Sequence, residues 1–153
     1  MDKKDCRLLT MLQKDCRQSI AELADRVALS PSACHRRIKQ LEERGIIQGY
    51  VAKIDGKKSG YLIEFFIELS LASQHQDALR AFEDAVKRVP EILECHLMTG
   101  KSDYILRVSA LDTADYERLY RDHIAQLPGV SRIQSSLVLR TVTQWSGYVV
   151  NPD

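Results

Sequence analysis

The chain has 153 residues, of which 44% are hydrophobic and 28% charged, which suits one ordinary globular domain or two small ones. No apolar run approaches the ~20 residues of a membrane span, and the first ten residues lack the apolar core of a signal peptide. We therefore expect a cytoplasmic protein with no membrane contact.

The four cysteines have no spacing typical of a metal site. They form no C-x-x-C pair, and no histidine lies at a zinc-ligand distance in sequence from two of them. We expect small buried or half-buried free thiols, with no metal and no cofactor. The four are Cys6, Cys16, Cys34 and Cys95.

The charge is divided unevenly along the chain, although the formal net charge is only +1. Residues 1–58 hold 13 Lys and Arg against 8 Asp and Glu, a net charge of +5. Residues 59–153 hold 9 against 13, a net charge of −4. This asymmetry suits a nucleic-acid reader joined to another domain, but it also suits an ordinary mixed surface, so charge alone does not decide.

The first 45 residues have the pattern of three short helices. Apolar residues at positions 8–12 share one helical face, and residues 19–22 form a capping box that begins a second helix. Ser30 and Pro31 suit the start of a third helix, which Gly45 ends. The short connection between the second and third helices predicts a helix-turn-helix. The alternative is a three-helix module that only dimerises.

The third helix presents polar side chains opposite its apolar stripe of Cys34, Ile38 and Leu41. We expect the early polar residues to reach base edges and the later ones to reach phosphates. Arg37 lies beside the apolar stripe, so it is interpreted as a structural or backbone-contacting residue. The candidates for contact with DNA are Ser32, His35, Arg36, Arg37, Lys39 and Gln40.

The remaining pattern predicts an α+β domain after a hinge. Residues 46–52 are β-like and residues 54–60 form a loop. We divide the chain into a helix-turn-helix domain (1–50), a hinge (51–60), a ferredoxin-like domain (61–145) and a tail (146–153). The expected elements are strands at 61–71, 92–99, 104–110 and 130–142, helices beginning with a capping box at 73–76 and at Asp112 or Thr113, and a short edge strand at 148–150.

The order of these elements, βαββαβ, is that of a ferredoxin-like antiparallel sheet with both helices on one face. The other face needs a cover, and its first strand places Phe66 between two glutamates, so we expect a partner subunit there. Neither a nucleophile–base constellation nor a phosphate-binding glycine loop is present in the sequence, so we do not expect an enzyme.

Several segments resemble the Lrp/AsnC family of bacterial and archaeal regulators. Residues 28–50 resemble its recognition helix and wing strand. Residues 94–100, 103–104 and 127–130 resemble landmarks of its effector domain. The resemblance runs in order from about residue 5 to about residue 145, and the ordered set is specific although each motif alone is weak.

This resemblance implies a winged or plain helix-turn-helix joined to a regulation-of-amino-acid-metabolism domain. It also implies dimers that form through the sheets, assembly into tetramers or octamers, operator DNA as one partner and a free amino acid as another. Lys101 departs from the family, which commonly has an acidic residue there, and this bears on the identity of the effector. The matching effector positions are Gly100, Asp103, Tyr104, Ser135 and Ser136.

The chemistry of the matching positions suits an amino acid, because Asp103 can accept from an α-ammonium group while serine hydroxyls and backbone N–H groups can hold an α-carboxylate. We expect a sequence-specific transcriptional regulator that oligomerises and senses an amino acid or related metabolite. Two alternatives stay open: an architectural DNA-wrapping protein without an effector, and a ferredoxin-like small-molecule-binding protein or enzyme with a dimerising helical unit.

Overall fold

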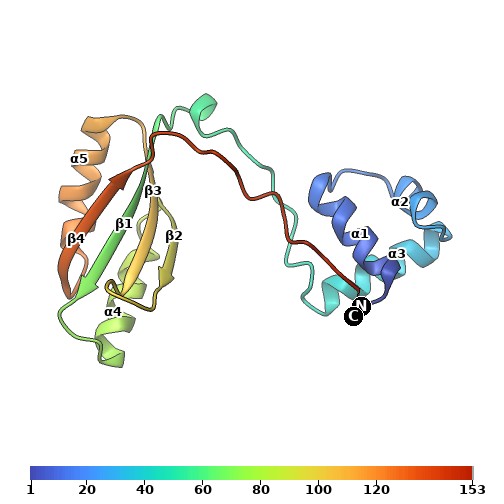
Figure 1. Ribbon diagram of the computed structural model, residues 1–153, viewed down its shortest axis with the longest axis horizontal. Coiled ribbons are helices and arrows are strands. Elements are labelled where there is room, and N and C mark those ends of the chain that lie inside the picture. Colours follow the sequence, from blue (N-terminus) through green and yellow to red (C-terminus); the bar gives the residue numbers. More distant parts are fainter. Residues whose placement is uncertain (153) are drawn as a thin grey trace. The chain divides into compact units, whose positions relative to one another are not determined.

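The computed structural model describes residues 1–152 and divides them into two compact units (Figure 1). The first unit contains residues 1–53 together with residues 142–152, and the second contains residues 54–141. No helix within residues 1–152 is both long enough and apolar enough to cross a membrane.

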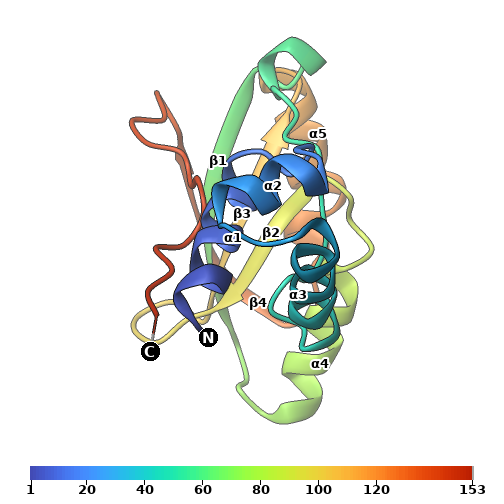
Figure 2. The ribbon, with the colours of Figure 1, turned by 90° about the vertical axis from the view of Figure 1, so that its right-hand side faces the viewer.

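The first unit is a bundle of three short helices (Figure 2). Side-chain caps fix where each helix begins. Asp2 and Asp5 form a capping box at the first helix, Ser19 and Glu22 form the predicted one at the second, and Ser30 caps the third. A small core of buried side chains, including Leu8, Leu23, Cys34 and Ile38, joins the three. The helices are α1 (Lys3–Lys14), α2 (Ile20–Arg26) and α3 (Pro31–Glu43).

The expected wing strand over residues 46–52 is absent from the first unit, and this prediction is wrong. A strand needs a neighbour to accept and donate its backbone hydrogen bonds, and no strand runs beside this segment in the first unit. The amides of Ile46 and Ile47 instead donate to Leu41 O at the end of α3. The Tyr50 hydroxyl donates to Glu42 at 2.8 Å, and burial together with Glu42 raises the pKa of Tyr50 to about 12.

The C-terminal tail belongs to the first unit and is held by the end of α1. The expected edge strand at residues 148–150 does not form. The Gln13 side-chain amide bonds both backbone groups of Tyr148, accepting from its N–H at 2.6 Å and donating to its carbonyl at 3.0 Å. Gly147 has a φ of +114°, and a Cβ there would lie 2.5 Å from Gln13 Oε1, so only glycine allows this approach.

The second unit is a four-stranded antiparallel sheet in the order β2-β3-β1-β4, with both helices on one face (Figure 1). This confirms the predicted βαββαβ order and the α+β class. The core between the sheet and the helices contains Ile67, Phe82, Leu106 and Leu119. The elements are β1 (Ile63–Leu71), α4 (Gln76–Val86), β2 (Ile92–Leu97), β3 (Tyr104–Ala110), α5 (Thr113–Asp122) and β4 (Val130–Leu137), with short 3-10 turns at Lys57–Ser59 and Ile124–Gln126.

Several boundaries in the second unit differ from the sequence prediction. β1 begins at Ile63 instead of residue 61, and β2 ends at Leu97 instead of residue 99. The last strand ends at Leu137, opposite Phe65, instead of at residue 142. The Val138 amide still donates to Glu64 O, but β1 begins at Ile63, so residues 140–142 lie beyond its last backbone partners. The expected capping box at residues 73–76 is also wrong. His75 occupies the N-cap of α4 without a side-chain bond, and Ser73 accepts a hydrogen bond from the His75 amide instead. Asp112 caps α5, which settles the choice between Asp112 and Thr113.

The cysteines are all free thiols within the described chain. Cys6 and Cys34 are buried and Cys95 is half-buried, as expected, but Cys16 is exposed. Cys16 lies in the connection after α1, where the polar sequence offers it no core to enter.

Candidate functional site

The polar face of α3 is open to solvent along its length. Cys34, Ile38 and Leu41 are buried on the opposite side, which confirms the helical phase expected from the sequence. The exposed side chains are the predicted reading residues Ser32, His35, Arg36, Lys39 and Gln40.

Few intramolecular bonds hold these exposed side chains. Lys39 Nζ lies 3.8 Å from Glu43 Oε1, an exposed pair of the kind that contributes at most about 1 kcal/mol. Ser32 Oγ lies 3.2 Å from Ser30 Oγ. Within residues 1–152, the side chains of His35, Arg36 and Gln40 make no hydrogen bond or ion pair, so their donors are available to another molecule.

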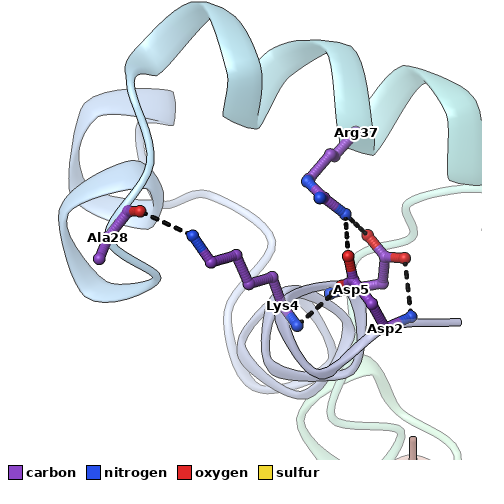
Figure 3. Close-up of polar contacts among 5 residues, drawn as sticks. All are labelled: Asp2, Lys4, Asp5, Ala28 and Arg37. Atoms are coloured by element: carbon purple, nitrogen blue, oxygen red, sulfur yellow. Dashed lines mark hydrogen bonds and ion pairs between the residues drawn. The ribbon is translucent and has the colours of Figure 1, made fainter.

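Arg37 has a different environment from its neighbours on α3, because it is half-buried and paired (Figure 3). Its Nη1 lies 2.6 Å from Asp2 Oδ2 and 2.8 Å from Asp5 Oδ1. The hydrogen bonds to Asp5 and Asp2 raise the pKa of the Arg37 guanidinium. The pKa of Asp2 is lowered, first by the Asp5 amide and then by Arg37. Through these contacts Arg37 joins α3 to the start of α1, which is a structural role.

The turn of the helix-turn-helix is held from the same end of α1. Lys4 Nζ donates to the carbonyl oxygen of Ala28 at 2.9 Å (Figure 3). Ala28 has a φ of +51°, a left-handed conformation that costs an L-residue with a Cβ roughly 1–2 kcal/mol. The Leu29 amide donates to Ala24 O beside it. The turn before α3 therefore has a strained backbone at Ala28, and Lys4 is hydrogen-bonded to that residue.

The turn at residues 100–103 connects β2 to β3 in the second unit. Gly100 has a φ of +127°, which favours glycine, and it is exposed. The two carboxylate oxygens of Asp103 accept from the Leu71 amide and from Gln74 Nε2, both at 2.7 Å. Asp103 therefore ties the turn to the loop that follows β1, and each of its oxygens retains a lone pair for another donor.

Tyr104 is part of the core. Its side chain is 1% exposed, and its hydroxyl donates to Glu83 Oε1 on α4 at 2.8 Å. Burial, together with this bond to Glu83, raises the pKa of the Tyr104 phenol. A contact between Tyr104 and an effector stays a prediction. The Tyr104 side chain already packs in the core and donates a hydrogen bond to Glu83.

Ser135 and Ser136 lie on opposite faces of the sheet, because consecutive strand residues alternate. Ser135 pairs with buried Ile67, and its Oγ accepts a hydrogen bond from the Tyr116 hydroxyl on α5 at 2.7 Å. Ser136 pairs with Phe66 on the face that carries no helix. The structure therefore separates these two candidates, and only Ser136 shares a face with Phe66.

The open face of the sheet also holds polar residues that the sequence analysis did not single out. The Ser102 hydroxyl donates to Glu68 Oε2 at 2.8 Å, and Glu68 pairs across the sheet with Gln134 on β4. Glu68 has no ion-pair partner among residues 1–152. The alternation of β1 places Glu68 on this face, but its position beside Ser102 and Gln134 depends on the register between strands.

Two other glutamates on this face, Glu64 and Glu94, are neutralised by an arginine of the same sheet. Arg107 on β3 binds Glu64 at 3.0 Å and Glu94 at 2.7 Å. Arg107, followed by His96, lowers the pKa of Glu94. Of the strand glutamates Glu64, Glu68 and Glu94, Glu68 is the one without an ion pair in the described residues, so it keeps its capacity for a cationic ligand.

Two family models match the two units of the chain. Residues 1–48 match the winged helix-turn-helix DNA-binding model, and residues 64–146 match the Lrp/AsnC ligand binding domain. A reading helix joined to a ligand-binding sheet defines a DNA-binding transcriptional regulator. The chain belongs to the Lrp/AsnC family, which confirms the resemblance found in its sequence.

Relatives are similar over most or nearly all of the chain. It is 36% identical over 150 residues to the leucine-responsive regulatory protein of Escherichia coli strain K12, covering 98% of this chain and 92% of that protein. It is 47% identical over 116 residues to an uncharacterised HTH-type transcriptional regulator of Sinorhizobium fredii, covering 76% and 91%.

Solved structures have the same fold. A transcriptional regulator of Neisseria meningitidis in complex with L-Met is 36% identical with a TM-score of 0.89, covering 94% of this chain and 93% of that one. An AsnC family transcriptional regulator of Agrobacterium tumefaciens is 32% identical with a TM-score of 0.91, covering 97% and 96%.

Proposed function

We propose that this protein binds operator DNA through the exposed face of α3 and adjusts that binding to a free amino acid held at the open face of its second unit. The observation that carries the proposal is that each unit presents its own set of exposed polar groups that are free to bind another molecule. One is the cationic face around Arg36 and Lys39, which suits base edges and phosphates. The other is the acidic and hydroxyl set around Glu68.

The effector site contains groups for both ends of an amino acid. Glu68 and Asp103 are the acceptors for an α-ammonium group, while the Ser136 hydroxyl and the exposed turn around Gly100 offer donors for an α-carboxylate. The related regulator in complex with L-Met supports an amino-acid ligand. Ser135 and Tyr104 act from behind this face, because both already bond to helices.

The variant Glu68→Gln is expected to weaken the response to the effector by about tenfold to a hundredfold. The substitution keeps an oxygen that can accept from Ser102 but removes the charge. A charge-assisted hydrogen bond contributes roughly 1.5–3 kcal/mol, at about 1.4 kcal/mol per tenfold change in affinity. The measurement is a titration of operator DNA by wild type and variant, with and without each amino acid of a panel that includes L-Met.

The control for this titration is Glu117→Gln, which removes an exposed charge from α5, a helix on the face of the sheet opposite Glu68. Both variants should keep the effector-free affinity for DNA, because the response is a coupling free energy between two sites. An identical response of wild type and Glu68→Gln would remove Glu68 from the site. A wild type that responds to no amino acid would favour the architectural alternative.

We also propose that the open face of the sheet is covered by a second copy of the chain, so that the effector site around Glu68 and Ser136 lies at the interface between the two copies. Both helices lie on the other face, and the exposed Phe66 side chain lies beside half-buried Arg107 and Glu64. Polar groups around a central aromatic residue are typical of an interface between subunits. Tetramers or octamers would then form from such dimers.

At micromolar concentration the protein is expected to have at least twice the mass of a single chain. Phe66→Glu should lower that mass, because it places a charge next to Glu64 and Glu68 in the proposed interface. Static light scattering after size-exclusion chromatography measures both. A monodisperse monomer for wild type, or an unchanged mass for Phe66→Glu, would show that this face is not the interface.

The protein acts by binding alone and not as an enzyme, in line with relatives that are transcriptional regulators. A regulator of this kind works in the compartment that holds its DNA, and we infer that this compartment is the cytoplasm.

A further inference from the structure

We propose that Asp2, Lys4, Asp5 and Arg37 form a clamp that sets the position of α3 on α1, and that these residues tune operator affinity without touching DNA. We call these four residues the N-terminal clamp. They lie within the first unit and join the first turn of α1 to the recognition helix and to the turn before it (Figure 3).

The first half of the clamp is the shared guanidinium nitrogen of Arg37. A single Nη1 donates to carboxylates of both Asp2 and Asp5. These carboxylates also form the capping box of α1: Asp2 accepts from the Asp5 amide at 2.9 Å, and Asp5 accepts from the Asp2 amide at 3.2 Å. The groups that begin α1 therefore also hold α3, so neither carboxylate can turn away without loosening the start of the helix.

The second half of the clamp is Lys4. Its bond to Ala28 O holds a residue in a left-handed conformation at the turn that leads into α3. The clamp thus fixes the recognition helix at two places, at its entry and at Arg37 in its middle. Binding groups keep their geometry to within about 0.5 Å only when such supporting contacts hold them.

The charges of the clamp argue against a direct role in phosphate binding. Arg37 is paired with two carboxylates, and the four clamp residues together carry no net charge, so the Arg37 charge is already balanced within the protein. Arg36, one residue earlier, is exposed and unpaired within residues 1–152. Consecutive helix residues differ by about 100° in direction, so the chain directs Arg36 outward and Arg37 toward α1.

The test uses the sign of the effect when an acidic residue is neutralised. Removing a negative charge from a DNA-binding domain ordinarily strengthens binding, because fewer phosphates are repelled. The clamp predicts the reverse for Asp5→Asn: a threefold to thirtyfold weaker affinity for specific operator DNA, which lies between the effect of losing an exposed ion pair and that of losing a charge-assisted hydrogen bond. The matched control is Asp25→Asn, an exposed α2 residue whose side chain has no hydrogen bond or ion pair in the described chain.

Arg37→Gln should weaken specific binding at least as much as Asp5→Asn, because it breaks the contacts to both Asp5 and Asp2. The double variant should be no weaker than Arg37→Gln alone, because Asp5→Asn then removes no further contact. The slope of log affinity against log salt should stay unchanged for Arg37→Gln, whereas losing a phosphate contact reduces it by about 1. Thermal unfolding of each variant establishes that it is folded, and the more exposed Asp2→Asn replaces Asp5→Asn if that variant does not fold.

Three results would overturn the clamp. One is a strengthened affinity for Asp5→Asn, equal to that of Asp25→Asn. Another is a reduced salt slope for Arg37→Gln, which would make Arg37 a phosphate contact. The third is additive losses in the double variant. Intact binding by the wild type in the same titrations separates failure of the clamp from failure of DNA binding itself.

Discussion

Raising the salt concentration from 50 to 200 mM is expected to weaken operator binding by about three orders of magnitude. Each phosphate that a cation neutralises on double-stranded DNA contributes about −0.9 to the slope of log affinity against log salt. Residues 1–58 carry a net charge of +5, and Arg36 and Lys39 are exposed on the reading helix. If two copies of the unit together neutralise about six phosphates, the fourfold rise in salt costs about 10³ in affinity.

Operator DNA and a scrambled duplex of equal length, titrated by fluorescence anisotropy across this range, measure the slope. Scrambled DNA should show a comparable slope with weaker binding, because phosphate contacts carry little sequence information. An affinity that is flat between 50 and 200 mM would contradict binding through the cationic face of α3.

Phe82→Ala is expected to lower the free energy of unfolding of the second unit by about 3–5 kcal/mol, while leaving the first unit intact. Phe82 is fully buried, and its ring lies 4.4 Å from that of Tyr104, centroid to centroid. Truncation leaves a cavity between α4 and the sheet. The first unit has its own core around Leu8 and Leu23, so it does not depend on this ring.

Chemical denaturation followed by hydrogen exchange at individual amides measures the loss and assigns it to a unit. The matched control is Tyr104→Phe, which keeps the ring packing and removes only the hydroxyl bond to Glu83, a change of roughly 0.5–3 kcal/mol. Equal loss of amide protection in α1–α3 and in the sheet would show that the two units unfold as one.

The reading face of the first unit could be predicted from the sequence because its signals are local. Ser19 and Ser30 precede their helices directly, and the spacing of Cys34, Ile38 and Leu41 sets the phase of α3. Every cue lies within a few residues of the feature it determines. The same is true of Asp112 at the start of α5.

The features that the sequence could not predict depend on partners distant in the chain. Arg37 meets Asp2 and Asp5 from 35 and 32 residues away, and the register that pairs Ser135 with Ile67 is a tertiary property. The prediction of a wing strand was wrong for a related reason. The apolar run at residues 46–52 has the composition of a strand, but no neighbouring strand in its unit pairs with it.

The tail held by Gln13 makes the first unit discontinuous in sequence, and this has a consequence for biosynthesis. Residues 142–152 complete that unit, but the whole second unit lies between them and α1. At 5–20 residues per second, the ribosome makes Gly147 and Tyr148 on the order of 10 s after Gln13. The three reading helices can pack while translation continues, whereas their contact with the tail forms only after the ligand-binding sheet has been made. The DNA-reading unit is thus begun first and finished last.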